Sequence, residues 1–302
     1  MFRANPPCGV ILFARNIQAP PQLAALIAHL RRVLPVGALL MVDQEGGRVA
    51  RLRPPHWRAH PPAARLGGVR AAWLTGALIG LDCAAAGFDV VAAPVLDLAV
   101  PGAHAVIGDR ALAEEPAAVA RLGRAFAAGL LAAGVQPVGK HAPGHGRARV
   151  DSHFAMPLVE ANDLDADLLP FALNADLPWA MSAHIVYPAW DGSLPATLSP
   201  TVIETIIRGR IGFEGVLVTD DLAMKALAGV PADLARRSLA AGCDVALYCS
   251  GDFAPTAELL VQCPPLTGAA TARLASARAF AARRRLPLDG AALAAERDRL
   301  LA

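Results

Sequence analysis

The segment from Lys140 to His153 reads KHAPGHGRARVDSH and concentrates side chains that can bind anions or move protons. It holds three histidines, one lysine, two arginines and one aspartate, although the chain as a whole is 55% hydrophobic and 18% charged. Imidazole exchanges protons near neutral pH because its ordinary pKa is about 6.5. Asp151 lies two residues before His153, so in an extended segment both side chains share one face and the carboxylate can fix the tautomer of the ring. The segment therefore predicts acid–base chemistry.

Two further stretches place carboxylates directly after short apolar runs. In VDQEGGRVAR, from Val42 to Arg51, Asp43 ends such a run and two glycines let the backbone turn tightly after it. In VTDDLAM, from Val218 to Met224, two adjacent carboxylates follow another run. Asp221 is suited to capping the next helix. Asp220, the last strand-like residue, is expected to point into an opening that the carboxyl ends of the strands share.

The cation beside His141 is unusual for this chain. Only two lysines occur, Lys140 and Lys225, against a large excess of arginine. A lysine offers a compact ammonium, whereas an arginine offers a planar fork. The choice of lysine predicts that position 140 needs the compact group.

Seven short apolar runs are expected to form the strands that position these groups. They alternate with Ala- and Leu-rich stretches of helical spacing, such as 21–33 and 116–133, which is typical of parallel strands buried on both faces. Seven strands over about 250 residues favour an α/β fold of the TIM-like (β/α)8 barrel type over an open doubly wound sheet. No G-x-G-x-x-G follows the first run, which argues against a dinucleotide-binding fold. The runs are Gly9–Phe13, Ala38–Val42, Phe88–Pro94, Val135–Lys140, Trp179–His184, Gly215–Thr219 and Asp244–Cys249.

Most of these runs end, on their carboxyl side, in a group that can bond or ionise. A barrel carries its chemistry at that rim, so residues distant in sequence are expected to converge on one mouth. For His184, which ends the fifth run, substrate contact and simple packing both stay open. The groups are Asp43, Asp97, the Lys140–His141 pair, His184 and Asp220.

Composition limits the classes of function. A formal charge of +2 over 302 residues is too small to indicate nucleic acid or an anionic membrane as partner. The five cysteines are odd in number and form no C-x-x-C pair, which suits reduced thiols in a cytoplasm. Neither a secretory signal nor an uncharged apolar run of spanning length is visible. We expect one catalytic barrel domain over residues 1–302, cytoplasmic, without metal or cofactor.

The KH-x-PGHG-x4-DSH loop, together with VDQEGGRVAR and TDDLAM, resembles glycoside hydrolase family 3, most closely its bacterial β-N-acetylhexosaminidase (NagZ-type) branch. GVILFARN, AAPVLDL and IGDR match the same branch in order and spacing. The resemblance implies that Asp220 is the nucleophile, that His153 donates and then accepts the proton, and that Asp151 orients His153. A nearby cation such as Lys140 or Arg51 would keep the nucleophile ionised. The positions matching substrate contacts are Asp43, Arg51, Arg110, Lys140 and His141.

The resemblance further implies a retaining exo-β-N-acetylglucosaminidase. Its substrate would be a small carbohydrate from peptidoglycan, bearing 1,6-anhydro-N-acetylmuramic acid with or without peptide. A family-3 β-glucosidase and an N-acetylglucosaminide phosphorylase stay open as alternatives. A non-catalytic sugar-binding barrel and a metal-dependent barrel hydrolase are alternatives of other classes. The last would bind zinc through histidines at strand ends, but the chain contains no H-x-H.

The chain departs from the family pattern in two places. Few residues precede NPPCGVILF, so the first barrel strand is expected to be missing or truncated. Ala142 stands where the family commonly has phenylalanine, which would loosen the packing beneath the loop. Gly144 and Gly146 suggest a loop that swings His153 over the mouth when substrate binds.

The remaining polar residues near these motifs are expected to be structural. Arg147 and Arg149 are expected to be solvated, with contact to a carboxylate on the leaving half of the substrate as the alternative. His145 is expected to bond to carbonyls of its own loop. His56 and His60, in the Pro-rich segment RPPHWRAHPP, are expected on a surface loop.

Overall fold

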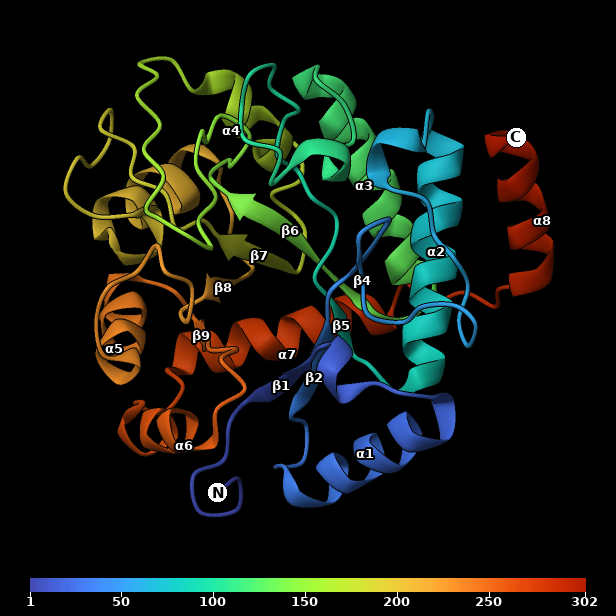
Figure 1. Ribbon diagram of the computed structural model, residues 1–302, viewed down its shortest axis with the longest axis horizontal. Coiled ribbons are helices and arrows are strands. Elements are labelled where there is room, and N and C mark those ends of the chain that lie inside the picture. The colour runs from blue at the N-terminus through green and yellow to red at the C-terminus, as the bar shows by residue number, and fades with distance from the viewer.

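The computed structural model describes residues 1–302 and is built around a sheet of seven parallel strands (Figure 1). The strands follow one another in chain order across the sheet, as in a wound barrel, and each corresponds to one of the predicted apolar runs. A separate antiparallel hairpin, β3 (Gln44–Gly46) with β4 (Val49–Ala50), follows the second strand. In sheet order the strands are β1 (Gly9–Leu12), β2 (Leu39–Val42), β5 (Val90–Val91), β6 (Gln136–Ala142), β7 (Trp179–Ser182), β8 (Val216–Asp221) and β9 (Val245–Leu247).

β1 and β9 are the two edges of this sheet, and no strand pairing joins them. The fold is therefore the predicted TIM-like barrel with one strand fewer than eight. A side chain bridges the two edges at their carboxyl ends. Arg15, which follows β1, donates from Nη2 to the carbonyl oxygen of Cys249, which follows β9, at 2.8 Å.

Helices alternate with the strands, and local chemistry sets their ends. Pro116 occupies the first turn of α3, and the Glu115 carboxylate caps it by accepting from two main-chain N–H groups. Gly87 ends α2 with a φ of +96°, a conformation that costs glycine little. The predicted helices 21–33 and 116–133 agree with α1 and α3 to within one residue. The helices are α1 (Pro20–Val33), α2 (Val69–Ala86), α3 (Pro116–Ala132), α4 (Asp165–Ala172), α5 (Pro231–Ala241), α6 (Phe253–Gln262), α7 (Gly268–Ala282) and α8 (Gly290–Leu301), with a π-helix, η5 (Val202–Arg210), and the short 3-10 helices η1 (Ala14–Asn16), η2 (Ala63–Arg65), η3 (Gly108–Arg110) and η4 (Ala196–Leu198).

The sheet has an apolar cluster on each face. Along β2, Leu40 and Val42 pack with residues of α1 and α2, whereas Leu39 and Met41 face the other way. The second face is completed by α7, which contributes Leu274 to the same cluster as Leu39 and Met41. Alternation along each strand thus separates an outer layer of helices from an inner core.

α7 covers the amino ends of the strands. Its Arg273 donates to the Asp244 carboxylate, just before β9, at 2.8 Å and to the carbonyl oxygen of Glu214, just before β8, at 3.1 Å. α7 also packs against β6 and β8. One end of the sheet is therefore closed by a helix, and the opposite, carboxyl end is where the polar strand ends gather.

α2 is long and apolar enough to cross a membrane by length and composition, with a mean hydropathy of 1.3 over 18 residues. More than half of those residues are buried, 56%, and the helix packs against α3 and α8. A Cβ at Gly76 would lie 2.1 Å from the carbonyl oxygen of Phe126, so α2 and α3 approach too closely for any larger residue there. This packing is that of a buried core helix.

His60 does not lie on a surface loop as predicted, although His56 is exposed. His60 is 8% exposed, and its Nε2 lies 3.1 Å from the carboxylate of Asp82 in α2. Arg297 of α8 lies 3.1 Å from its Nδ1. The ring therefore ties the Pro-rich segment to two helices, a role that needs partners distant in sequence.

Candidate active site

The carboxyl ends of β2 and β6 bring Asp43 and Lys140 into contact. Lys140 Nζ donates to Asp43 Oδ1 at 3.0 Å and lies 2.6 Å from Oε1 of Glu45. Its side chain is only 3% exposed. A compact ammonium can sit between two carboxylates in so small a space, whereas the planar guanidinium of arginine needs a wider fork. The geometry supports the prediction that position 140 requires lysine.

Two arginines extend this contact into a row of alternating charges. Arg51 Nη2 donates to Asp43 Oδ2 at 3.1 Å, and Arg110, at the end of η3, donates from Nε and Nη2 to the two oxygens of Glu45 at 2.8 Å each. Burial alone would raise the pKa of both carboxyls, but Lys140 and the arginines lower each below its ordinary value. Asp43 and Glu45 are therefore ionised at neutral pH, and they alternate with the cations Arg51, Lys140 and Arg110. We call this set the charge row.

Glu45 is the member of the charge row that the sequence interpretation did not select. It lies in β3 and is 5% exposed. The hairpin packs closely, since a Cβ at Gly46 would lie 2.3 Å from the carbonyl oxygen of Pro61, and Gly46 has a φ of +103°. The available signal was its position two residues after Asp43, because alternate residues of an extended chain share one side.

Asp97 follows β5 and organises the start of the histidine-rich loop. Its buried carboxylate accepts the main-chain N–H of His141 at 3.1 Å, the main-chain N–H of His145 at 2.6 Å and Nδ1 of His141 at 2.7 Å. Burial raises the pKa of Asp97, but these neighbours lower it below its ordinary value. The carboxylate therefore holds the proton of His141 on Nδ1, and Nε2 of that ring has no partner within the protein.

Asp220 lies near the end of β8. Burial raises its pKa, but His141, His184, the main-chain N–H of Asp221 and Lys140 together lower it below its ordinary value. The N–H of Asp221 donates to Asp220 Oδ1 at 2.8 Å. Asp220 is therefore an anion at neutral pH, as a nucleophile must be. Both cations suggested for this task belong to the charge row, and of the two it is Lys140 that helps to lower the pKa of Asp220.

His184 and Asp221 hold the loops around Asp220. His184 is fully buried, with Nδ1 2.9 Å from Thr197 Oγ1 and Nε2 3.0 Å from the carbonyl oxygen of Asp221. Both ring nitrogens are thus occupied, which favours packing over substrate contact. Asp221 does not cap a helix as predicted. Its Oδ1 instead accepts the N–H groups of Ala223 and Cys249, each at 2.8 Å.

Asp151 and His153 pair as predicted, but in a turn rather than an extended segment. Asp151 Oδ1 lies 2.7 Å from His153 Nδ1 and accepts the main-chain N–H of the same residue at 2.8 Å. The main-chain N–H of Phe154 closes the turn onto the carbonyl oxygen of Asp151. The His153 side chain is 61% exposed and that of Asp151 is 14% exposed. We call these two residues the dyad.

The first half of the loop is firmly packed. A Cβ at Gly146 would lie 2.4 Å from the carbonyl oxygen of Leu98, and the Tyr187 hydroxyl donates to the carbonyl oxygen of Gly144 at 2.6 Å. Arg147 is not solvated as predicted, since its Nε donates to Asp167 at 2.7 Å. Arg149 is exposed. The two glycines therefore allow the loop backbone to approach neighbouring residues closely. The suggested movement of His153 over the site stays a prediction, and it concerns the dyad turn alone.

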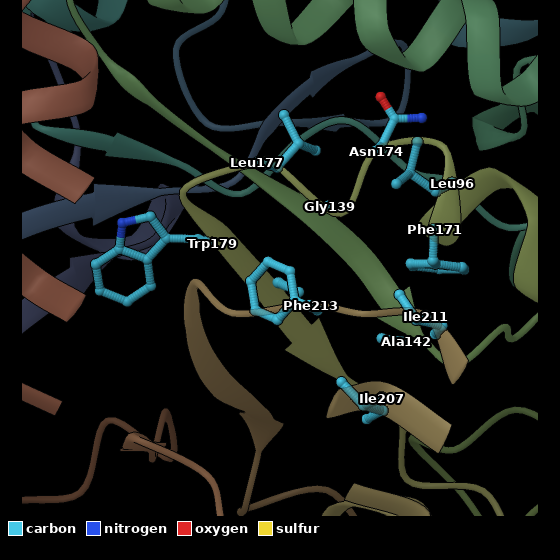
Figure 2. Close-up of a pocket in the computed structure, with 11 residues that line it drawn as sticks. Leu96, Gly139, Ala142, Phe171, Asn174, Leu177, Trp179, Ile207, Ile211 and Phe213 are labelled. Carbon is cyan, nitrogen blue, oxygen red and sulfur yellow. The ribbon is translucent and has the colours of Figure 1, made fainter. Parts of the chain in front are cut away.

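Ala142 ends β6 directly beneath this loop and lines a small apolar cavity (Figure 2). The cavity has a volume of about 10 Å³, roughly the space of one water molecule. Phe171, Ile211 and Phe213 surround it. Only a void of about the size of one water molecule adjoins Ala142, so the side chains around it are closely packed and packing beneath the loop is not loose.

Comparison with known proteins places this geometry in a family. The model of the glycosyl hydrolase family 3 N-terminal domain matches residues 4–272. A β-hexosaminidase of Nitrosospira multiformis is 40% identical over 273 residues, which cover 84% of this chain and 76% of that protein. NagZ from Neisseria gonorrhoeae, solved in complex with N-trifluoroacetyl-D-glucosamine, is 34% identical with a TM-score of 0.74 over 91% of this chain and 90% of that one.

A further solved structure agrees with these matches. A family 3 β-N-acetylglucosaminidase from Paenibacillus has a TM-score of 0.82 and 32% identity over 93% of this chain, which corresponds to 58% of that longer chain. The matches cover both the barrel and the loops that carry the site. The chain belongs to glycoside hydrolase family 3 and is a β-N-acetylhexosaminidase.

Proposed function

We propose that this enzyme removes terminal, non-reducing β-linked N-acetylglucosamine from peptidoglycan fragments that bear 1,6-anhydro-N-acetylmuramic acid, with or without peptide. The gonococcal relative binds an N-acylated glucosamine, which supports an N-acyl sugar as the preferred substrate. We place the reaction in the cytoplasm, in the recycling of cell-wall fragments. All five cysteines are free thiols, which supports a reducing compartment.

The proposed mechanism retains the configuration of the sugar by two displacements. Asp220 attacks the anomeric carbon, and the bond to the leaving oxygen breaks as that oxygen takes a proton from Nε2 of His153. The ring, now neutral, accepts a proton from the water that attacks the glycosyl ester, and Asp220 leaves as a carboxylate. Asp151 holds the proton on Nδ1 throughout and stabilises the charged ring.

The charge row and His141 are assigned to the sugar itself. Asp43 and Arg51 present a carboxylate and a guanidinium, and Lys140 and Arg110 present cations whose geometry is fixed by Glu45. Groups held in place before substrate arrives lose little entropy on binding. They also strengthen their bonds to hydroxyl groups as charge develops in the transition state.

One observation carries the proposal. Asp220 is held ionised at the end of β8, and the loop that follows β8 is tied to the dyad turn. The main-chain N–H of Ala226, in that loop, donates at 3.1 Å to the carbonyl oxygen of Ser152, which lies between Asp151 and His153. A nucleophile and a proton donor on linked segments are the two groups that glycoside cleavage requires.

The test compares hydrolysis of a chromogenic N-acetylglucosaminide and a chromogenic glucoside, with and without inorganic phosphate. We expect hydrolysis of the N-acetylglucosaminide, no acceleration by phosphate, and a loss of about 10⁴-fold or more in Asp220→Ala. A fluorinated mechanism-based inhibitor should label the peptide that contains Asp220. Preference for the glucoside, a glycosyl phosphate product, or a label elsewhere would contradict the proposal.

A further inference from the structure

Ser152 makes all the hydrogen bonds that connect the dyad turn, residues 151–155, with the rest of the protein. The residue is 2% exposed, although His153 beside it is open to solvent. Its Oγ lies 3.3 Å from Nε2 of His145, and its carbonyl oxygen accepts the N–H of Ala226 at 3.1 Å. The other bonds of the turn are internal, from His153, Phe154 and Ala155 to Asp151.

His145 is held by contacts outside the dyad turn. Its main-chain N–H donates to Asp97 at 2.6 Å, and its ring meets the ring of His141 edge to face with centroids 5.6 Å apart. The side chain is buried, and Asp220 is among the charges that act on it. His145 is therefore a buried residue that contacts the dyad turn and lies near enough to Asp220 for that charge to act on its ring.

We propose that Ser152 and His145 form a positioning pair that sets the height of the dyad above Asp220. The pair acts through Asp151 and His153 and touches no substrate atom, and this role rests on the proposed function. A turn of five residues held by Ser152 at its second position moves as one body, so loss of the Oγ contact shifts His153 relative to the leaving oxygen.

The proposal predicts an effect that depends on the leaving group. Proton donation matters most where the departing oxygen is a poor leaving group and matters little where it leaves as a stable anion. A displacement of about 1 Å in a positioned group can cost about 100-fold in rate. A purely structural role for Ser152 would instead lower activity equally for every substrate, because less folded enzyme would be present.

The experiment measures kcat/KM of Ser152→Ala on two aryl N-acetylglucosaminides, one with phenol and one with 2,4-dinitrophenol as leaving group. We expect a loss of about 10-fold or more on the phenyl substrate and of less than about 2-fold on the dinitrophenyl substrate. Sodium azide, a nucleophile that needs no base, should raise kcat of the variant on the dinitrophenyl substrate and leave the wild type unchanged.

Two further variants make the result independent of one substitution. His145→Gln removes the ring from the other side of the contact and should show the same dependence on the leaving group. The double variant should lose no more activity than the less active of the two single variants, because both changes break the same interaction. Ser238→Ala is the matched control, since Ser238 is equally buried, donates to the carbonyl oxygen of Ala235 at 2.9 Å and lies in α5 away from the site. It should match the wild type on both substrates.

The outcomes separate this inference from the function on which it rests. If Asp220→Ala stays active, the proposed function fails and the positioning pair fails with it. If Asp220→Ala is inactive and His153→Ala loses activity only on the phenyl substrate, the function stands. In that case, equal losses of Ser152→Ala on the two substrates, or no loss on either, would overturn the positioning pair alone.

Discussion

The charge row and the dyad occupy one site but are built in opposite ways. In the charge row, Glu45 and Lys140 are 5% and 3% exposed and are held by strands and a tight hairpin. In the dyad, the His153 side chain is 61% exposed on a turn. Groups that bind a sugar gain from being fixed before it arrives. His153, the proposed proton donor, would meet both a leaving oxygen and an incoming water, and such a group needs access to solvent.

The two regions also differ in what their charges cost. Each ion in the charge row is desolvated, so its stability depends on the neighbouring opposite charge, and removal of one partner leaves another buried and unpaired. The imidazole of the dyad is 61% exposed, so water screens the ion pair and makes it worth little to stability. Mutation should therefore separate the regions, with stability lost in the first and turnover lost in the second.

The largest effect is expected in the dyad, the exposed region. His153→Ala should lower kcat/KM by about 10²–10⁴-fold on substrates whose leaving group needs a proton. The free energy of unfolding should change by less than about 0.5 kcal/mol, because the side chain is mostly in water. Leaving-group kinetics and urea unfolding measure the two quantities. Equal losses on activated and unactivated substrates would argue against His153 as the acid.

Mutations in the charge row, the buried region, should lower the free energy of unfolding. Glu45→Ala leaves Lys140 and Arg110 buried without their shared carboxylate and should cost about 3–5 kcal/mol in the free energy of unfolding. Glu45→Gln keeps the shape, so it should cost less in stability while raising KM. Glu258→Ala, on the exposed face of α6, is the control and should be nearly neutral. A Glu45→Ala variant as stable as this control would show that the charge row contributes nothing to folding.

Acid should lower the stability of the protein through its buried histidines. Burial and the neighbouring His141 lower the pKa of His145 to about 4, whereas an unfolded chain binds that proton near pH 6.5. Between these values the unfolded state holds more protons, so the free energy of unfolding falls as the pH drops from 6.5 to 4. The contribution of His145 is about 3 kcal/mol.

His60 and His184, whose pKa values burial also lowers, act in the same direction. Chemical unfolding measured at several pH values tests this dependence. His145→Gln should reduce the slope of stability against pH in this window, and an unchanged slope would contradict the assignment.

The smallest effect is expected beneath the loop. Ala142→Val adds two methyl groups next to a cavity of about 10 Å³ and should change stability by less than about 1 kcal/mol. Ala142→Phe overfills the same space and should cost about 1–3 kcal/mol. Thermal unfolding measures both. If the phenylalanine variant proved more stable than the wild type, the packing around Phe171 and Phe213 would be looser than described.

The strands, and the need for a compact ammonium at position 140, were predictable because each follows from residue types read along the chain. Apolar runs bounded by glycine and proline mark buried parallel strands, and all seven predicted runs form strands. What sequence could not supply were long-range partners. His60 is buried because Asp82 and Arg297 meet it from two helices, and Arg147 is held by Asp167 from α4.

The same limit explains the residues near the site that were missed or misassigned. In the sequence, Glu45 resembles any polar residue of a turn, because its partner Arg110 is 65 positions away. Ser152 is an ordinary serine in sequence, and its burial becomes visible only through His145. The pairing of Asp151 and His153 was foreseen from their spacing, but the turn that brings it about was not.

The unpaired edges of the sheet lie on either side of the chemistry. Asp43 follows the second strand from one edge and Asp220 lies in the second strand from the other, so the proposed sugar site lies across the seam between β1 and β9. Through the sheet the two carboxylates are connected only by way of β5, β6 and β7, and across the seam the Arg15 side chain spans the gap. In the proposed mechanism, widening the seam would move Asp220 away from Asp43, so closure of the barrel would also align the proposed nucleophile with the groups proposed to bind the sugar.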